Sequence, residues 1–140
     1  MAKTIQTIKG SIDVDSVGLT LPHEHLFTDL RGPLVDGYAQ AEPADVVRVV
    51  EPFLADASAA GATALVECST VGVGRNLGIL QRLAEVSPIN IIAPIGVYRD
   101  AFIPPSLRDM GEAELASCGS RNLRKASRRL LFVQVSSSWR

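Results

Sequence analysis

The 140-residue sequence has little cysteine and histidine, with two residues of each. Cys68 and Cys118 lie far apart in unlike surroundings, so the sequence predicts no disulfide framework and favours a reducing cytoplasm. No hydrophobic run approaches the length of a membrane span, and residues 1–10 lack the apolar segment of a secretion signal. We therefore expect a soluble, cytoplasmic protein with no membrane partner.

The sequence also lacks an excess of charge of either sign. Its net charge is -1, which gives no whole-chain reason to expect a nucleic-acid partner. The hydrophobic fraction of 46% and the charged fraction of 21% are typical of globular proteins. A chain of this length can form one domain with a hydrophobic core.

Acidic residues are absent from the end of the chain. Residues 1–116 contain all fifteen acids and eight of the basic residues, whereas residues 117–140 contain six basic residues and no acid. We interpret residues 117–140 as a divergent basic tail, disordered or translated from a shifted reading frame. The alternative is a basic arm that binds nucleic acid or an anionic membrane, but neither aromatic interleaving nor an amphipathic pattern supports it.

The pattern of apolar residues predicts strands that alternate with helices. A hairpin is expected from residues 4–9 and 11–17, followed by strands at 19–25, 63–67 and 90–96. One helix should begin at Pro43 and end before Gly61, a second should cover 76–86, and 28–41 should be a loop. Pro52 should kink or break the first helix, and Pro94 should interrupt the third strand unless it lies at a bulge or strand end. This alternation indicates an α/β fold.

The two histidines lie one residue apart at the end of the first expected strand of the sheet. Side chains alternate faces along a strand, so His23 and His25 should point the same way and Glu24 the other way. Two imidazoles on one face can form half of a tetrahedral or five-coordinate metal site. The alternative is a pair of ordinary polar residues at a strand end.

Several motifs in a fixed order carry a resemblance to a known family. They are IDVD at 12–15, GLTLPHEH at 18–25, GATALVECST at 61–70, GVGR at 72–75, NIIA at 90–93, GVYRD at 96–100 and IPP at 103–105. Over about residues 4–115 the sequence resembles the phosphotriesterase family of the amidohydrolase superfamily. It departs from the family pattern at Asn76, where aspartate is more common.

The resemblance implies the N-terminal part of a TIM-like (β/α)8 barrel, about three βα units, preceded by a short β-hairpin. A complete barrel needs about 250 residues, so residues 1–116 are expected to form a partial barrel domain. The same resemblance implies a metal-dependent hydrolase that cleaves a small-molecule ester, namely a phosphotriester, a carboxylester or a lactone, through a metal-bridging hydroxide. The full-length form of such a protein could be a homodimer.

The resemblance further implies that His23 and His25 ligate the more buried of two divalent metal ions, most commonly zinc. The other ligands would be a carboxylated lysine or a glutamate, two histidines and an aspartate from later strands, which this sequence does not contain. We therefore expect no catalytic residue in this chain and favour inactivity of the 140 residues alone. The alternative function is that of a non-catalytic, truncated fragment that binds metal weakly or not at all.

Other polar residues near the expected strand ends are weaker candidates. Glu67 and Cys68 end the second strand of the sheet, and we favour structural packing over metal binding for both. The segment 72–75 lacks the spacing of a phosphate-binding loop, so Arg75 is expected to pair with a neighbouring loop. Tyr98 and Arg99 follow the third strand and could line a substrate pocket or lie exposed on a loop.

Overall fold

The computed structural model describes residues 3–117 and 132–133. Its first strands, β1 (Thr4–Thr7) and β2 (Gly10–Asp13), form an antiparallel two-stranded sheet, followed by a 3-10 turn at Val14–Ser16. The predicted N-terminal hairpin is therefore confirmed, with strands shorter than expected. The Ile8 backbone N–H donates to the Ile91 carbonyl at 2.8 Å, which attaches the hairpin to the main sheet.

The main sheet is parallel and has the order β3-β4-β5-β6. It contains β3 (Leu19–Glu24), β4 (Ala62–Glu67), β5 (Asn90–Pro94) and the short β6 (Phe132–Val133). The three strands predicted from the sequence are confirmed. Among the described residues, β3 has a strand on one side only.

The strand β6 was not predicted, because it lies in the segment interpreted as a tail. Phe132 and Val133 are residue types that favour strands, and β6 pairs with β5 through Ala93 and Pro94. The other tail residues, 118–131 and 134–140, lie outside the described residues. Their interpretation as a disordered or frameshifted segment, and the boundary near residue 116, stay predictions.

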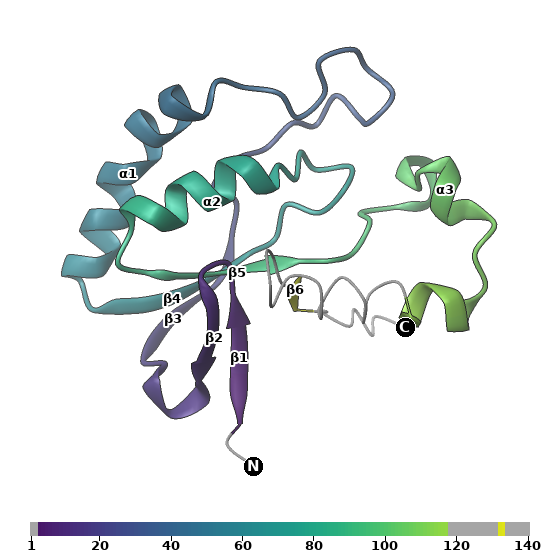
Figure 1. Cartoon of the computed structure of the whole chain (residues 1–140). Helices are drawn as coiled ribbons and strands as arrows, with labels where there is room; N and C mark the ends of the chain where they lie inside the picture. Colours follow the sequence, from purple (N-terminus) through teal and green to yellow (C-terminus); the bar gives the residue numbers. More distant parts are fainter. Residues whose placement is uncertain (1–2, 118–131, 134–140) are drawn as a thin grey trace.

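Two helices connect the parallel strands and lie together on one side of the sheet (Figure 1). They are α1 (Pro43–Ala59), between β3 and β4, and α2 (Leu77–Val86), between β4 and β5. A 3-10 turn at Asp100–Phe102 and the short α3 (Pro105–Arg108) follow β5. The alternation β-α-β-α-β is that of an α/β barrel segment and confirms the predicted fold class. In the part of the chain that the structure describes, every helix is too short or too polar to span a membrane.

Pro52 was predicted to kink the first helix or to break it into two pieces. Helix α1 runs through Pro52 without ending, so it is not broken there, and the kink stays a prediction. Proline removes the hydrogen bond to the carbonyl four residues earlier, here that of Arg48. Both Pro52 and Arg48 are exposed, so water can bind that carbonyl. The helix begins with Pro43 at its N-terminus and ends before Gly61, whose φ is 96°.

Pro94 lies at the last residue of β5, which ends two residues earlier than predicted. A strand end is one of the two positions that the sequence analysis allowed for this proline. The chain can therefore leave the sheet directly after Pro94.

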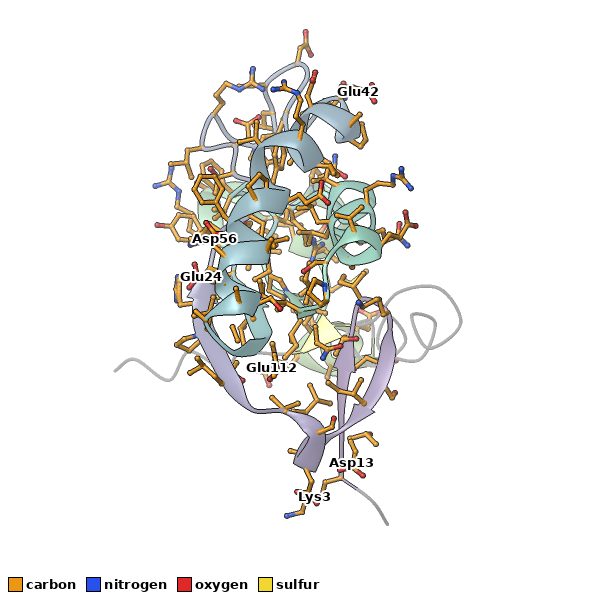
Figure 2. The ribbon with its side chains drawn as sticks, turned by 90° about the vertical axis from the view of Figure 1, so that its left-hand side faces the viewer. Lys3, Asp13, Glu24, Glu42, Asp56 and Glu112 are labelled. Carbon is orange, nitrogen blue, oxygen red and sulfur yellow. The ribbon has the colours of Figure 1, made fainter. Side chains whose placement is uncertain are left out.

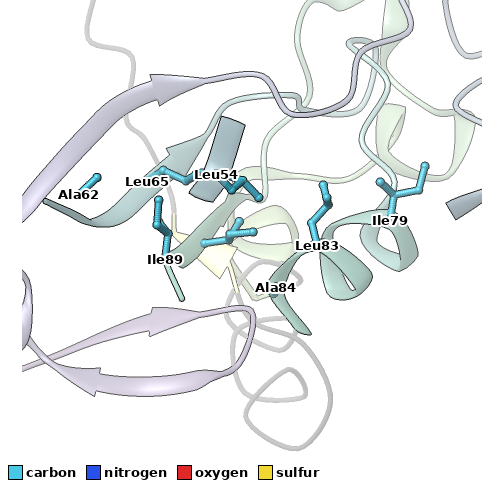
Figure 3. Packing of buried hydrophobic residues seen from close by; sticks show 8 residues of the cluster. Leu54, Ala62, Leu65, Ile79, Leu83, Ala84 and Ile89 are labelled. Carbon is cyan, nitrogen blue, oxygen red and sulfur yellow. The ribbon is translucent and has the colours of Figure 1, made fainter. Parts of the chain in front are cut away.

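The core lies between the helices and the sheet (Figure 3). Its members share almost complete burial and come from α1, β4, α2, β5 and the residue before β5: Leu54, Ala62, Leu65, Ile79, Leu83, Ala84, Ile89 and Ile91. Burying a leucine or isoleucine side chain contributes about 1.5–3 kcal/mol. This packing fixes the position of β4, and Leu21 of β3 packs against the same cluster. The carboxyl ends of these two strands carry the candidate site.

Candidate metal centre

The two histidine rings face each other at the carboxyl end of β3. Their Nε2 atoms are 3.3 Å apart, and the ring centroids are 5.1 Å apart with an angle of 68° between the planes. His23 lies in β3, His25 follows its last residue, and both side chains are exposed. The prediction that the alternation of the strand brings the rings together is confirmed by this distance.

The separation of 3.3 Å limits what can lie between the rings. Two facing nitrogen lone pairs would repel, so the rings share either a hydrogen or a cation. Two nitrogen ligands at about 2.0–2.1 Å from a tetrahedral zinc ion are about 3.3–3.4 Å from each other. The His23 and His25 rings therefore fit two ligand positions of such an ion.

The pair makes up only part of a metal site. Within residues 3–117, the structure contains no group of three or more histidine, cysteine, aspartate or glutamate side chains that could hold a metal ion. A tetrahedral ion needs four ligands, and two imidazoles alone hold it weakly.

The His25 side chain contacts Ser69, which lies two residues after the end of β4. Its Nδ1 lies 3.0 Å from the hydroxyl oxygen of Ser69, a residue with a relative exposure of 1%. The strand pairing sets up this contact, because Glu24 is in register with Glu67 and the carboxyl ends of parallel strands meet at one edge. The sequence analysis did not identify Ser69, although its position just after β4 was a usable signal.

Glu67 is completely buried beside this contact. Its carboxylate accepts hydrogen bonds from the backbone N–H groups of Ser69, at 2.9 Å, and Leu26, at 3.3 Å. Burial raises the pKa of the Glu67 carboxyl above its ordinary value, while hydrogen bonds from Ser69 and Leu26 and the nearby His25 act in the opposite direction. Glu67 thus binds protein groups of its own chain, in line with the structural role we favoured.

Cys68 and Glu24 take no part in the histidine pair. Burial, followed by the charge of Glu67, raises the pKa of the Cys68 thiol and so disfavours the thiolate that would bind a metal. The backbone N–H of Cys68 donates to the carbonyl of Glu24 at 2.7 Å. Figure 2 shows Glu24 at the end of β3, at the outer edge of the sheet.

The glycine-rich loop after β4 is bound by the loop after β3. The Tyr38 hydroxyl accepts hydrogen bonds from the backbone N–H groups of Gly72 and Gly74, both at 2.8 Å. These N–H groups are therefore not directed at a phosphate. Arg75 donates to the Pro94 carbonyl at 3.0 Å, so it contacts the end of β5, one strand away from its own loop.

Tyr98 and Arg99 lie on the segment that follows β5. Tyr98 is 60% exposed, and the Arg99 guanidinium lies 4.2 Å from the ring centroid of Phe102. The loop exposure that we considered is thus observed for Tyr98. A role for either side chain in a substrate pocket stays a prediction.

Comparison with known proteins gives a consistent result. The sequence model of the "Phosphotriesterase family" matches residues 3–117. The "Phosphotriesterase homology protein" of Mycobacterium tuberculosis is 28% identical over 102 residues, which cover 71% of this chain and 31% of that protein. The "N-acetyltaurine hydrolase" of Xenopus tropicalis is 28% identical over 138 residues, covering 79% of this chain and 40% of that protein.

Solved structures agree with these sequence matches. The phosphotriesterase from Mycobacterium tuberculosis superimposes with a TM-score of 0.65 and 26% identity, over 78% of this chain and 34% of that one. A mutant organophosphorus hydrolase from Deinococcus radiodurans gives a TM-score of 0.74 at 21% identity, over 92% of this chain and 41% of that one, and supports the fold. The chain thus spans about a third to two fifths of these proteins. The family match, the parallel sheet and the barrel structures together show that this chain belongs to the phosphotriesterase family.

Proposed function

We propose that the chain supplies the N-terminal part of a metal-dependent hydrolase, in which His23 and His25 are two ligands of a zinc ion. The observation that carries the proposal is the 3.3 Å separation of the two Nε2 atoms, which suits a shared tetrahedral ion. When bound, a zinc ion polarises a substrate oxygen and supplies hydroxide at neutral pH. The contribution of this chain is to place two neutral nitrogen ligands at the carboxyl end of β3.

The proposed substrate class is a small-molecule ester: a phosphotriester, a carboxylester or a lactone. Membership of the phosphotriesterase family supports this class. A second class, N-acyl amides, is favoured by relatives that are named N-acetyltaurine hydrolases and are 28–29% identical to this chain. A cytoplasmic location and the lack of a nucleic-acid or membrane partner are part of the same proposal.

The competing proposal is a non-catalytic fragment that binds metal weakly or not at all. Its support is the small ligand set, because residues 3–117 bring together only the two histidines. The two proposals agree that the 140 residues alone do not hydrolyse substrate. They differ in whether residues 1–116 can serve in a complete barrel.

A chimera separates the two proposals. Residues 1–116 would be joined to the remaining part of the Mycobacterium tuberculosis phosphotriesterase homology protein and assayed with zinc on a phosphotriester, a lactone, an aryl acetate and N-acetyltaurine. We expect hydrolysis of at least one substrate by the chimera, and its loss on His23→Ala. A folded chimera that binds zinc but hydrolyses none of the four would favour the non-catalytic fragment.

A further inference from the structure

We propose that Ser69 and Glu67 are positioning residues for His25, which hold its ring so that Nε2, and not Nδ1, faces the metal position. This inference rests on the proposed function, because positioning of His25 serves metal binding. The orientation and tautomer of the ring can nevertheless be measured in the metal-free chain. Neither residue needs to touch a substrate or a metal ion.

The first step is the contact between His25 and Ser69. A neutral imidazole carries its hydrogen on one nitrogen only, and the partner of that nitrogen selects the tautomer. The Ser69 hydroxyl oxygen lies 3.0 Å from Nδ1 of His25 and is buried, so it offers no site to water in exchange. If Nδ1–H donates to this oxygen, the lone pair of His25 is on Nε2.

The second step is the direction of the Ser69 hydroxyl hydrogen. A hydroxyl group can donate one hydrogen bond, and the Glu67 carboxylate lies beside Ser69, whose backbone N–H donates to it at 2.9 Å. A carboxylate only accepts, and the Ser69 side chain helps to lower the pKa of Glu67, so we expect the hydroxyl hydrogen to point to Glu67. The oxygen lone pairs of Ser69 are then left for the Nδ1–H of His25.

The third step is that Glu67 itself is fixed. It is fully buried, and its two oxygens accept the backbone N–H groups of Leu26 and Ser69. Leu26 follows His25 directly in the chain, so the carboxylate holds the backbone beside the ring as well as the serine that binds it. Metal-binding histidines commonly donate their second nitrogen to such a carboxylate or hydrogen-bonded partner.

The fourth step assigns the hydrogen in the contact between His25 and His23. With the lone pair of His25 on Nε2, the 3.3 Å contact between the rings requires that Nε2–H of His23 donates to it. The metal-free chain should therefore contain two different tautomers, Nε2–H in His23 and Nδ1–H in His25. Both rings turn Nε2 to the shared position, where a cation would replace the hydrogen.

Nitrogen NMR of the imidazole rings tests this directly, because the chain has only two histidines. At about pH 8, we expect the Nδ1–H tautomer for His25 in the metal-free wild type. In Ser69→Ala the population should shift to Nε2–H, and the zinc Kd measured by calorimetry should rise about tenfold or more. A smaller shift in the same direction is expected for Glu67→Gln, whose amide can donate to the serine oxygen.

The matched control is Ser87→Ala, which removes a second buried serine hydroxyl, one that accepts from the Ile89 N–H. It should lower stability without changing either tautomer. If Ser69→Ala does not fold, Ser69→Cys replaces the hydroxyl by a thiol, a weak hydrogen-bonding group, and should give part of the shift. An unchanged His25 tautomer in a folded Ser69 variant overturns the inference. A tautomer shift in a chain that binds no zinc supports it and counts against the proposed function instead.

Discussion

The hydroxyl oxygen of Tyr38 accepts a hydrogen bond from the backbone N–H of Gly74 at 2.8 Å. It accepts a second one from Gly72 at the same distance, and both glycines are buried. One phenol group therefore joins the loop after β3 to the loop after β4. Tyr38→Phe would leave two buried N–H groups without an acceptor, and we expect the free energy of unfolding to fall by about 1–3 kcal/mol.

Chemical denaturation of Tyr38→Phe measures this loss in the free energy of unfolding, with Tyr98→Phe as the control. Tyr98 is 60% exposed, so loss of its hydroxyl should change the free energy of unfolding by less than about 0.5 kcal/mol. Equal effects of the two substitutions would mean that the Tyr38 hydroxyl does not stabilise the loops.

Gly74 allows the two loops to approach each other. Its φ is 103°, and a Cβ there would overlap the backbone nitrogen of Asp29, which itself donates to the Val73 carbonyl at 2.9 Å. Gly74→Ala should lower the free energy of unfolding by about 3 kcal/mol or more. Gly37 also has a positive φ, 70°, but a Cβ there would meet nothing within 4 Å.

Gly37→Ala is therefore the control for backbone strain without steric overlap. Gly37→Ala should lower the free energy of unfolding by about 1–2 kcal/mol. The difference between its loss and that of Gly74→Ala measures the steric overlap at Gly74. Similar losses for both variants, in the same thermal or urea denaturation series, would contradict the close approach at Gly74.

Asn76 makes two hydrogen bonds of opposite kind. Its Oδ1 accepts the Ile79 N–H at 3.1 Å and so caps α2, and its Nδ2 donates to the Ala39 carbonyl at 2.8 Å. Asn76→Asp would keep the cap but place a carboxylate against a carbonyl, and we expect a loss of about 1–2 kcal/mol. Asn76→Ala, which loses both contacts, should be less stable still. An aspartate variant as stable as the wild type would show that the contact with Ala39 adds nothing.

The ion pair of Asp29 with Arg31 predicts a response to acid. Their contact at 2.7 Å, helped by the Ala39 N–H, holds the pKa of the Asp29 carboxyl well below its ordinary value of about 3.9. The folded state thus favours the ionised form, so the stabilisation is present above about pH 4 and is lost as the pH falls further. Asp29→Asn should therefore be less stable than the wild type near pH 7. Its free energy of unfolding should also fall less than that of the wild type when the pH is lowered.

Urea denaturation between about pH 7 and pH 3 checks the acid response. Asp45→Asn is the control, since Asp45 and Arg48 form an exposed pair with side-chain exposures of 69% and 73%, and exposed pairs contribute little. A pH dependence of Asp29→Asn that matches the wild type would rule out Asp29 as a source of acid sensitivity.

The fold could be predicted from the sequence wherever a single local rule decides the structure. Pro43, Gly61 and the apolar periodicity gave helix α1, and the alternation about His23 and His25 gave the facing rings. The sequence could not decide whether Pro52 breaks the helix, because the effect of a proline depends on whether the freed carbonyl is exposed, and exposure is a property of the tertiary structure.

The site could be predicted only in part for a related reason. Ser69 acts on His25 through a contact between residues 44 positions apart, which depends on the register of β3 with β4. That register includes shifts near Leu19 and between Leu21 and Glu24 that no residue pattern specifies. The strand β6 was missed because pairing with β5 depends on an available sheet edge as well as on strand propensity.

Calorimetric zinc titration of the 140-residue chain tests the central claim, that His23 and His25 share one cation. We expect weak binding by the wild type, no binding by His23→Ala or His25→Ala, and nearly unchanged binding by Glu24→Gln, because the alternation of side chains along a strand directs residue 24 to the other face. The account would be contradicted if the wild type bound no zinc, or if Glu24→Gln lost binding while His25→Ala kept it.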